Sequence, residues 1–290
     1  MKRPFSAVFA ILLAGWLSAH NELIAQTGNS SAGAQSVLAL TRANNGQHIA
    51  ARVGQTIQVD VQSLGSAEYE SPQVSSPSVR YLNSVRAMPP NPGGAIPIFI
   101  FEAVSAGEAE IRIPRHDSPG FAVTVEVKPG AEQAGTLVRL DQSNTIDAGA
   151  GWTNLVNHAV QTFTPSLPKL VKVEVELVEG NSTPDHAVAL TLLNTDGQSM
   201  AIAEKTLSSD EPGWVPFFFA NGGVDLVPGE VYGIEVSGGN RFGWKYGEGG
   251  YLKGEALFNG TPILKGAHAS FLFKTFGTKP DSAAPLEPRP

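Results

Sequence analysis

The sequence predicts an all-β protein that folds into two antiparallel β-sandwich domains. Apolar and polar residues alternate in short segments, which is the period of a strand with one buried face. Glycine and proline, 31 and 21 of the 290 residues, interrupt the chain often, and no long segment has the 3.6-residue apolar period of a helix. The strands with the clearest alternation are predicted at residues 57–61, 109–113, 121–127, 171–177 and 188–192.

The N-terminus has the pattern of a cleaved signal peptide. Two basic residues precede an apolar run over residues 5–17, which is too short to span a bilayer comfortably. Cleavage after Ala25 gives a signal peptide over 1–25 and a flexible lead over 26–35, with the small residues 32–34 as a later alternative site. We expect a secreted or periplasmic protein with no membrane insertion after cleavage. A retained membrane anchor is the alternative.

The composition excludes several classes of function. The chain has no cysteine, so disulfides, thiolate catalysis and cysteine-ligated metals are ruled out. Its formal net charge is −7 and it has no cluster of Lys and Arg, so neither nucleic acid nor an anionic membrane surface is an expected partner. An exported protein without disulfides depends on its hydrophobic cores, and domains of roughly 100 to 140 residues can supply them.

A stretch of small residues divides the chain into two domains. We predict the first domain over 36–129, a linker over 130–135 and the second domain over 136–277. Residues 278–290 are rich in proline and poor in apolar side chains, so we expect a disordered tail there.

Three segments of the first domain, 53–59, 91–103 and 106–113, carry a resemblance to a known family. Through these segments the first domain is similar to the chagasin-like family of cysteine-protease inhibitors. It implies an immunoglobulin-like sandwich that blocks proteases with three loops: one with an Asn-Pro-Thr-Thr-Gly element, one rich in glycine and one with Arg-Pro-Trp.

Only one of these three loops has a counterpart here, the glycine-rich pair Gly93 and Gly94. Residues 63–67, Ser-Leu-Gly-Ser-Ala, stand where the first loop belongs, and residues 115–117, Arg-His-Asp, replace the third loop without its tryptophan. We therefore expect no tight inhibition of papain-like proteases by this domain.

The second domain resembles the jelly-roll domains of secreted bacterial proteins, which are related in style to carbohydrate-binding modules. The resemblance is carried by short apolar strands, Pro-Gly turns and late aromatic residues at 160–165, 213–219, 228–234, 242–246 and 270–273. It implies a jelly-roll sandwich that recognises a ligand and performs no catalysis.

Catalytic and metal-binding patterns are sparse. The six histidines are scattered, with no His-Glu-x-x-His pattern, and no Gly-x-Ser-x-Gly elbow occurs, so we predict that the protein is not an enzyme. We predict neither a metal site nor a cofactor. A structural calcium is the alternative, with oxygen ligands from Asp141, Asn144, Asp147 or Asp196. Residues 194–197, Asn-Thr-Asp-Gly, are better suited to a hairpin turn.

Aromatic residues in a glycine-rich and charged segment are the expected ligand site. Trp244 and Tyr246 are two residues apart and so share a strand face, which suits the stacking of a sugar ring. Arg241 and Tyr251 lie in the same segment, and Trp152 is a second loop aromatic. The alternative is that Trp244 and Tyr246 pack inside the sandwich.

These observations predict an exported, non-catalytic protein whose jelly-roll domain binds an extracellular carbohydrate or another cell-surface ligand. Three other functions remain open. The protein could be a structural or adhesion protein that binds protein surfaces, a protease inhibitor acting through the first domain, or a hydrolase. The inhibitor hypothesis requires loops clustered at one end of the first domain.

Overall fold

The computed structural model describes residues 37–61, 69–86, 97–116, 118–129, 138–149, 151–156, 158–180, 187–208, 212–264 and 268–279. The signal peptide, the lead and the linker proposed from the sequence lie outside these residues, as does the tail from residue 280 onward. This part of the domain organisation stays a prediction. The described residues all belong to one compact unit, Ala32–Pro290.

The described chain is all-β, as predicted. Its regular elements are strands and one three-residue 3-10 turn, Arg42–Asn44. None of the helical structure in the described residues is long and apolar enough to cross a membrane.

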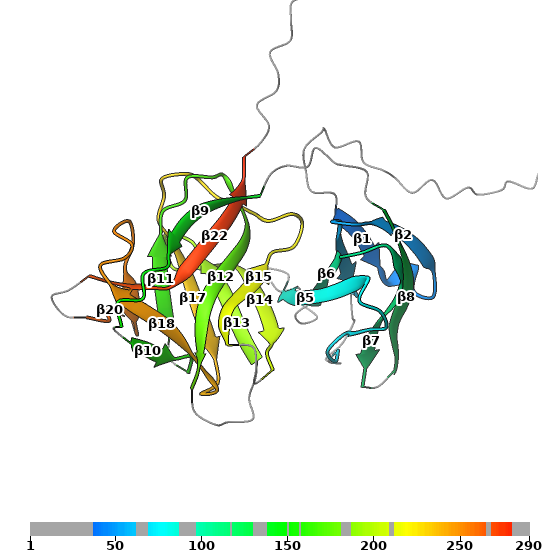
Figure 1. Cartoon of the computed structure of the whole chain (residues 1–290), viewed down its shortest axis with the longest axis horizontal. Coiled ribbons are helices and arrows are strands. Elements are labelled where there is room, and N and C mark those ends of the chain that lie inside the picture. The colour runs from blue at the N-terminus through cyan, green and yellow to red at the C-terminus, as the bar shows by residue number, and fades with distance from the viewer. Residues whose placement is uncertain are drawn as a thin grey trace, which may run out of the picture. The chain divides into compact units, whose positions relative to one another are not determined.

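The N-terminal part is a sandwich of two sheets around one core (Figure 1). One sheet contains β1 (Val37–Thr41), β3 (Thr56–Asp60), β6 (Pro97–Ala103) and β5 (Val79–Arg86), and the other contains β2 (His48–Arg52), β8 (Ser118–Lys128), β7 (Gly107–Arg115) and β4 (Gln73–Val74). The 3-10 turn carries the chain from β1 to β2, which belongs to the other sheet. Thr41 caps this turn by accepting a hydrogen bond from the Ala43 N–H.

The C-terminal part is a second sandwich. One sheet contains β14 (Ser199–Thr206), β13 (Ala187–Leu193), β17 (Tyr232–Gly238), β11 (Ala159–Phe163), β19 (Ala256–Phe258) and β20 (Thr261–Pro262). The other contains β10 (Gly151–Asn154), β18 (Phe242–Glu248), β12 (Lys169–Glu179), β22 (Phe273–Thr278), β9 (Arg139–Asn144), β15 (Gly213–Phe218), β16 (Val224–Asp225) and β21 (Ala269–Phe271). Alternate residues of β12, such as Val173 and Val175, fill the core, as their period of two predicts.

The two sandwiches share a sheet. Strand β5 pairs antiparallel with β14 and so joins them into a sheet of ten strands. The buried Asn83 amide also donates to the Phe218 carbonyl oxygen and accepts from the Phe218 N–H, at 2.9 Å each. The Asn83 side chain thus satisfies the backbone N–H and carbonyl groups of Phe218 in β15, which would otherwise need a neighbouring strand as their partner.

Candidate functional site

The ligand residues expected from the sequence lie on opposite faces of one sheet. Side chains of β18 alternate between the core and the outer surface. Trp244 and Tyr246 point toward the core, whereas Gly243 and Lys245 belong to the outer face, where Trp152 of β10 is the register partner of Lys245. Trp152 and Trp244, which the sequence predicted in one ligand site, therefore lie on opposite sides of the sheet.

Trp244 is a core residue. Its side chain is fully buried, and its ring stacks on Phe271 with centroids 4.1 Å apart and planes 12° apart. The indole nitrogen donates a hydrogen bond of 3.0 Å to the Leu272 carbonyl oxygen. The Trp244 ring therefore has no exposed face on which a ligand could stack. The structure thus shows the packing alternative rather than the stacking platform that the sequence suggested.

Tyr246 and Tyr251 pack against the same core. Tyr246 meets Phe271 edge-on, with centroids 6.1 Å apart. Tyr251 is buried, and its hydroxyl donates to Gln142 Oε1 at 3.0 Å and accepts from the Thr164 N–H at 3.2 Å. Burial raises the pKa of Tyr251. Both tyrosines contribute to packing: Tyr251 is buried in the core, and Tyr246 is partly buried against it.

The glycines around Trp244 explain this outcome. The sequence suggested that they uncover the ring, but they allow other segments to approach β18 closely. A Cβ atom on Gly243 would lie 2.2 Å from Cε3 of Trp152, and one on Gly247 would lie 2.3 Å from the Ile146 carbonyl oxygen. Gly243 therefore provides the space in which the Trp152 ring lies on the strand.

Trp152 is the exposed aromatic residue among the sequence-based candidates. It is 46% exposed although it lies within β10, an edge strand that pairs with β18 alone. Its benzo ring lies against the Gly243 backbone, so the underside is supported and much of the remaining surface faces solvent.

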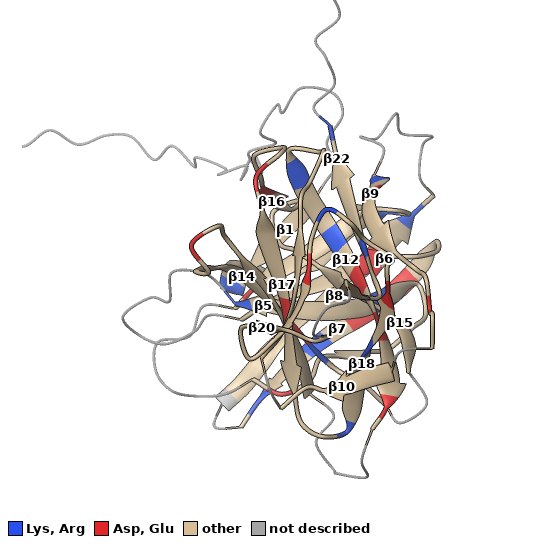
Figure 2. Cartoon of the chain, turned by 90° about the vertical axis from the view of Figure 1, so that its left-hand side faces the viewer, with Lys and Arg blue, Asp and Glu red and all other residues tan. Residues whose placement is uncertain are grey.

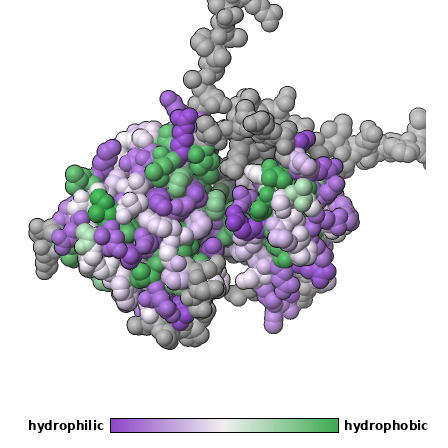
Figure 3. Space-filling view, in the orientation of Figure 1, coloured by the Kyte–Doolittle hydropathy of each residue, from purple (hydrophilic) through white to green (hydrophobic). Residues whose placement is uncertain are grey.

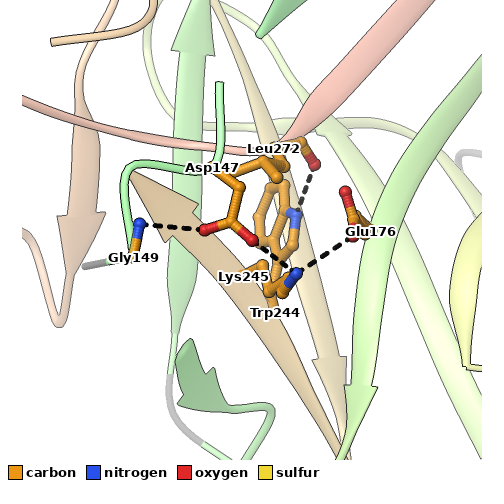
Figure 4. A network of polar contacts seen from close by, with 6 residues as sticks. All are labelled: Asp147, Gly149, Glu176, Trp244, Lys245 and Leu272. Atoms are coloured by element: carbon orange, nitrogen blue, oxygen red, sulfur yellow. Dashed lines mark hydrogen bonds and ion pairs between the residues drawn. The ribbon is translucent and has the colours of Figure 1, made fainter. Parts of the chain in front are cut away.

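Lys245 lies beside Trp152 and is held by two carboxylates (Figure 4). Its ammonium group donates to Asp147 Oδ2 at 2.7 Å and to Glu176 Oε1 at 3.2 Å. Hydrogen bonds from Lys245 and from the Gly149 N–H lower the pKa of Asp147, and the hydrogen bonds to Asp147 and Glu176 raise the pKa of Lys245. Figure 4 shows the Trp244 indole nitrogen directed at Leu272 instead.

Arg241, which the sequence assigned to the ligand site, is largely buried and pairs with Glu179 at 3.2 Å. We call the surface formed by Trp152, Gly243 and Lys245, with the carboxylate partners Asp147 and Glu176, the Trp152 face. Basic and acidic residues lie side by side around β12 and β15 (Figure 2), and hydrophilic and hydrophobic residues are interspersed over this sandwich (Figure 3). In the Trp152 face, the one ammonium group is paired with two carboxylates.

A row of side chains crosses four strands from Trp152. The row runs through Lys245 and Glu176 to Trp214, which is the register partner of Glu176 on β15. Trp214 is half-buried, and the Lys274 ammonium group lies 3.7 Å from its ring centroid. The Trp214 ring is therefore already covered, in contrast to that of Trp152.

Three of the four candidate calcium ligands, Asp141, Asn144 and Asp147, have side chains engaged in other contacts. Asp141 accepts from the Ser166 N–H, and the buried Asn144 amide donates to the Ser270 and Phe271 carbonyl oxygens. Asn194 accepts from the Asp196 N–H in the turn of the β13–β14 hairpin, which confirms the predicted turn. In the described residues no group of three or more His, Asp or Glu side chains could hold a metal ion.

The N-terminal sandwich has a second candidate surface. Three pairs of strand ends meet at one end of it, through the register partners Asp60 and Ile98, Arg86 and Pro97, and Arg115 and Ser118. The connections 61–69, 86–97 and 115–118 all leave from this end, which we call the loop end. Residues 63–67, Gly93, Gly94 and Asp117 of the expected loops lie outside the described residues, whereas Arg115 and His116 are described.

Tyr69 braces the loop end. Its hydroxyl donates to the Val61 carbonyl oxygen at 2.9 Å, and its backbone bridges to Arg115. Its ring packs edge-on against Phe99 with centroids 6.2 Å apart, and the Arg115 guanidinium lies 5.7 Å from its centroid. These contacts tie both sheets together where the loops begin.

A hollow of about 420 Å³ adjoins the loop end. It is lined by Tyr69, Tyr81, Ser84, Arg86, Phe99 and Glu204, among others. Arg86 Nε donates to Glu204 Oε2 at 2.8 Å, and burial raises the pKa of Tyr81 to about 12.

Sequence reasoning placed Lys245 among the polar groups near the aromatic pair but did not single it out, and it did not identify Gly243 and Tyr69. Lys245 stands between the two aromatic residues that were chosen and so lies on the other strand face. The buried face follows from the register with β12, because Leu177 pairs with Trp244, and this register is not visible in the sequence. Tyr69 has no sequence signal beyond its place after the first expected loop.

Comparisons with known proteins give no family. No family model matches the chain, and no curated protein matches it. Among solved structures, the cysteine protease inhibitor EhICP2 from Entamoeba histolytica aligns with 32% of this chain and 96% of its own, at 9% identity and a TM-score of 0.27. The solution structure of Amebosin aligns with 32% of this chain and 98% of its own, at 17% identity and a TM-score of 0.22. Similarity of this size says nothing of function.

Proposed function

We propose that this chain is a non-catalytic binding protein that recognises a protein partner through the loop end. The observation that carries the proposal is the convergence of three connections at one end of a sandwich braced by Tyr69. Binding residues are often placed on loops that a rigid scaffold positions. The signal-peptide pattern over residues 1–25 supports a site of action outside the cytoplasm.

One serine–histidine contact among the described residues does not have the geometry of a catalytic pair. Ser270 Oγ lies 3.5 Å from His268 Nε2, but Ser270 is fully buried. Both side chains bind the Tyr251 carbonyl oxygen, at 3.2 and 2.6 Å. A buried hydroxyl engaged with backbone groups cannot attack a substrate.

A papain-like cysteine protease is the partner class that we propose. The three connections of the loop end stand in the same chain order as the inhibitory loops of the chagasin-like family, which the first domain resembles. Only the pair Gly93 and Gly94 matches that family's motifs. We therefore expect binding weaker than that of a dedicated inhibitor, with a Kd in the range of about 1–100 μM.

The test measures binding of the chain from residue 26 onward to papain inactivated at its catalytic cysteine, by interferometry. His116→Glu places a charge at the exposed loop end and should weaken binding at least tenfold. Val104→Glu is the matched control, because Val104 is 41% exposed in the β6–β7 turn at the opposite end of the sandwich, and it should bind like wild type.

Two results would overturn the proposal. One is the absence of papain binding at about 100 μM, and the other is an equal loss of binding in both variants. Submicromolar inhibition that disappears when Gly93 and Gly94 are replaced would support the loop end as the binding site. It would contradict only the expectation that binding is weak.

A further inference from the structure

We infer that the Trp152 face binds an uncharged polysaccharide. This site is separate from the loop end and does not depend on the proposed function. Three features carry the inference: a supported and exposed aromatic ring, polar groups fixed beside it, and an ammonium group that is already paired with two carboxylates.

The ring of Trp152 meets the first requirement of sugar recognition. The C–H face of a pyranose ring packs against an aromatic plane that is both accessible and held in place. Trp152 is 46% exposed, and its benzo ring lies on the Gly243 backbone with no side chain between them. Trp244 and Tyr251 offer no comparable ring because both are buried in the core, and Tyr246 is partly buried and packs against that core.

The polar groups beside Trp152 suit sugar hydroxyls. Lys245 lies next to Trp152 across the β10–β18 pair, and its ammonium group is held in place by Asp147 and Glu176. An ammonium group has three donors and each carboxylate has several acceptor sites, so further hydrogen bonds remain possible. Donors and acceptors in fixed positions match hydroxyls, which both donate and accept.

Charge favours an uncharged ligand. Lys245 is paired with two carboxylates, those of Asp147 and Glu176. These three groups together carry a net negative charge, which opposes a uronate or a sulfate. The row from Trp152 through Lys245 and Glu176 extends across the sheet, which suits a chain of sugars better than a single one.

The test uses affinity electrophoresis of the full chain in gels that contain soluble β-glucan, galactomannan, arabinoxylan or galactan, with polygalacturonate as the anionic probe. Wild type should be retarded by at least one neutral polymer and not by polygalacturonate. Trp152→Ala should lower the affinity at least tenfold, because the stacking of about one aromatic ring contributes affinity on this scale. The melting temperature should not change.

Two further variants separate ligand binding from folding. Gly243→Ala retains Trp152 but places a methyl group where its ring lies, so it should weaken binding as well. Leu252→Ala removes a side chain that is 81% exposed and outside the Trp152 face, so it should bind like wild type. Retention of wild-type affinity by Trp152→Ala, binding to none of the four neutral polymers, or preferential binding of polygalacturonate would each overturn the inference.

Discussion

Neighbouring residues of β18 have opposite roles. Trp244 is fully buried and hydrogen-bonded to Leu272, whereas Lys245 is fixed on the outer surface by Asp147 and Glu176. The role of each side chain follows from the strand face on which it lies, which the chemistry of the residue does not reveal.

Replacement of Trp244 by alanine tests its place in the core. The change removes the ring that stacks on Phe271 and leaves a cavity, so Trp244→Ala should lower the free energy of unfolding by about 3–5 kcal/mol. Urea denaturation followed by circular dichroism measures this value. A loss below about 1 kcal/mol would contradict the burial of the ring.

Tyr81 should make the stability sensitive to alkaline pH. Burial raises its pKa to about 12 in the folded protein, from 10.0 for the free side chain. Between these values the unfolded chain loses the phenolic proton and the folded chain keeps it, so stability falls as the pH rises from 10 to 12. The shift corresponds to about 2–3 kcal/mol.

The variant Tyr81→Phe isolates this effect from other groups that titrate at high pH. Its free energy of unfolding should fall less than that of wild type between pH 10 and 12, as measured by denaturation at several pH values. Parallel pH profiles for the two proteins would show that the Tyr81 hydroxyl is not buried.

At the scale of elements, the sequence predicted the positions of the strands better than it predicted which face of each strand is buried. The alternation of Val173, Val175 and Leu177 marks the buried side of β12 because only one parity is apolar. In β18 one parity carries Phe242, Trp244 and Tyr246 and the other carries Gly243, Lys245 and Gly247, so the alternation separates the two faces but does not say which of them is buried. The register with β12 and β10 decides the matter, and register is a property of the sheet rather than of one strand.

The pairing of β5 with β14 was also beyond prediction. These strands are more than a hundred residues apart, and nothing in either segment indicates the other. Asn83 illustrates the difficulty, since it is a polar residue in an apolar strand whose partner is the Phe218 backbone. A buried amide can be explained only when its partner is known.

For the whole molecule, limited proteolysis tests the domain organisation. We expect cleavage within residues 130–135 and in the tail after residue 279, because both segments lack a strand pattern. The two fragments should nevertheless elute together in gel filtration, since the β5–β14 ladder and the Asn83 contacts hold them together. Resistance of 130–135 to cleavage would contradict the domain boundary, and separate elution would contradict the shared sheet.

The clamp on Lys245 has a consequence for covalent labelling. Two carboxylates keep its amine protonated, and a protonated amine does not attack an activated ester. An exposed lysine such as Lys253 should react with such reagents first. Attachment of the protein to a sensor surface through its amines should therefore leave the ring of Trp152 and its neighbouring lysine chemically intact.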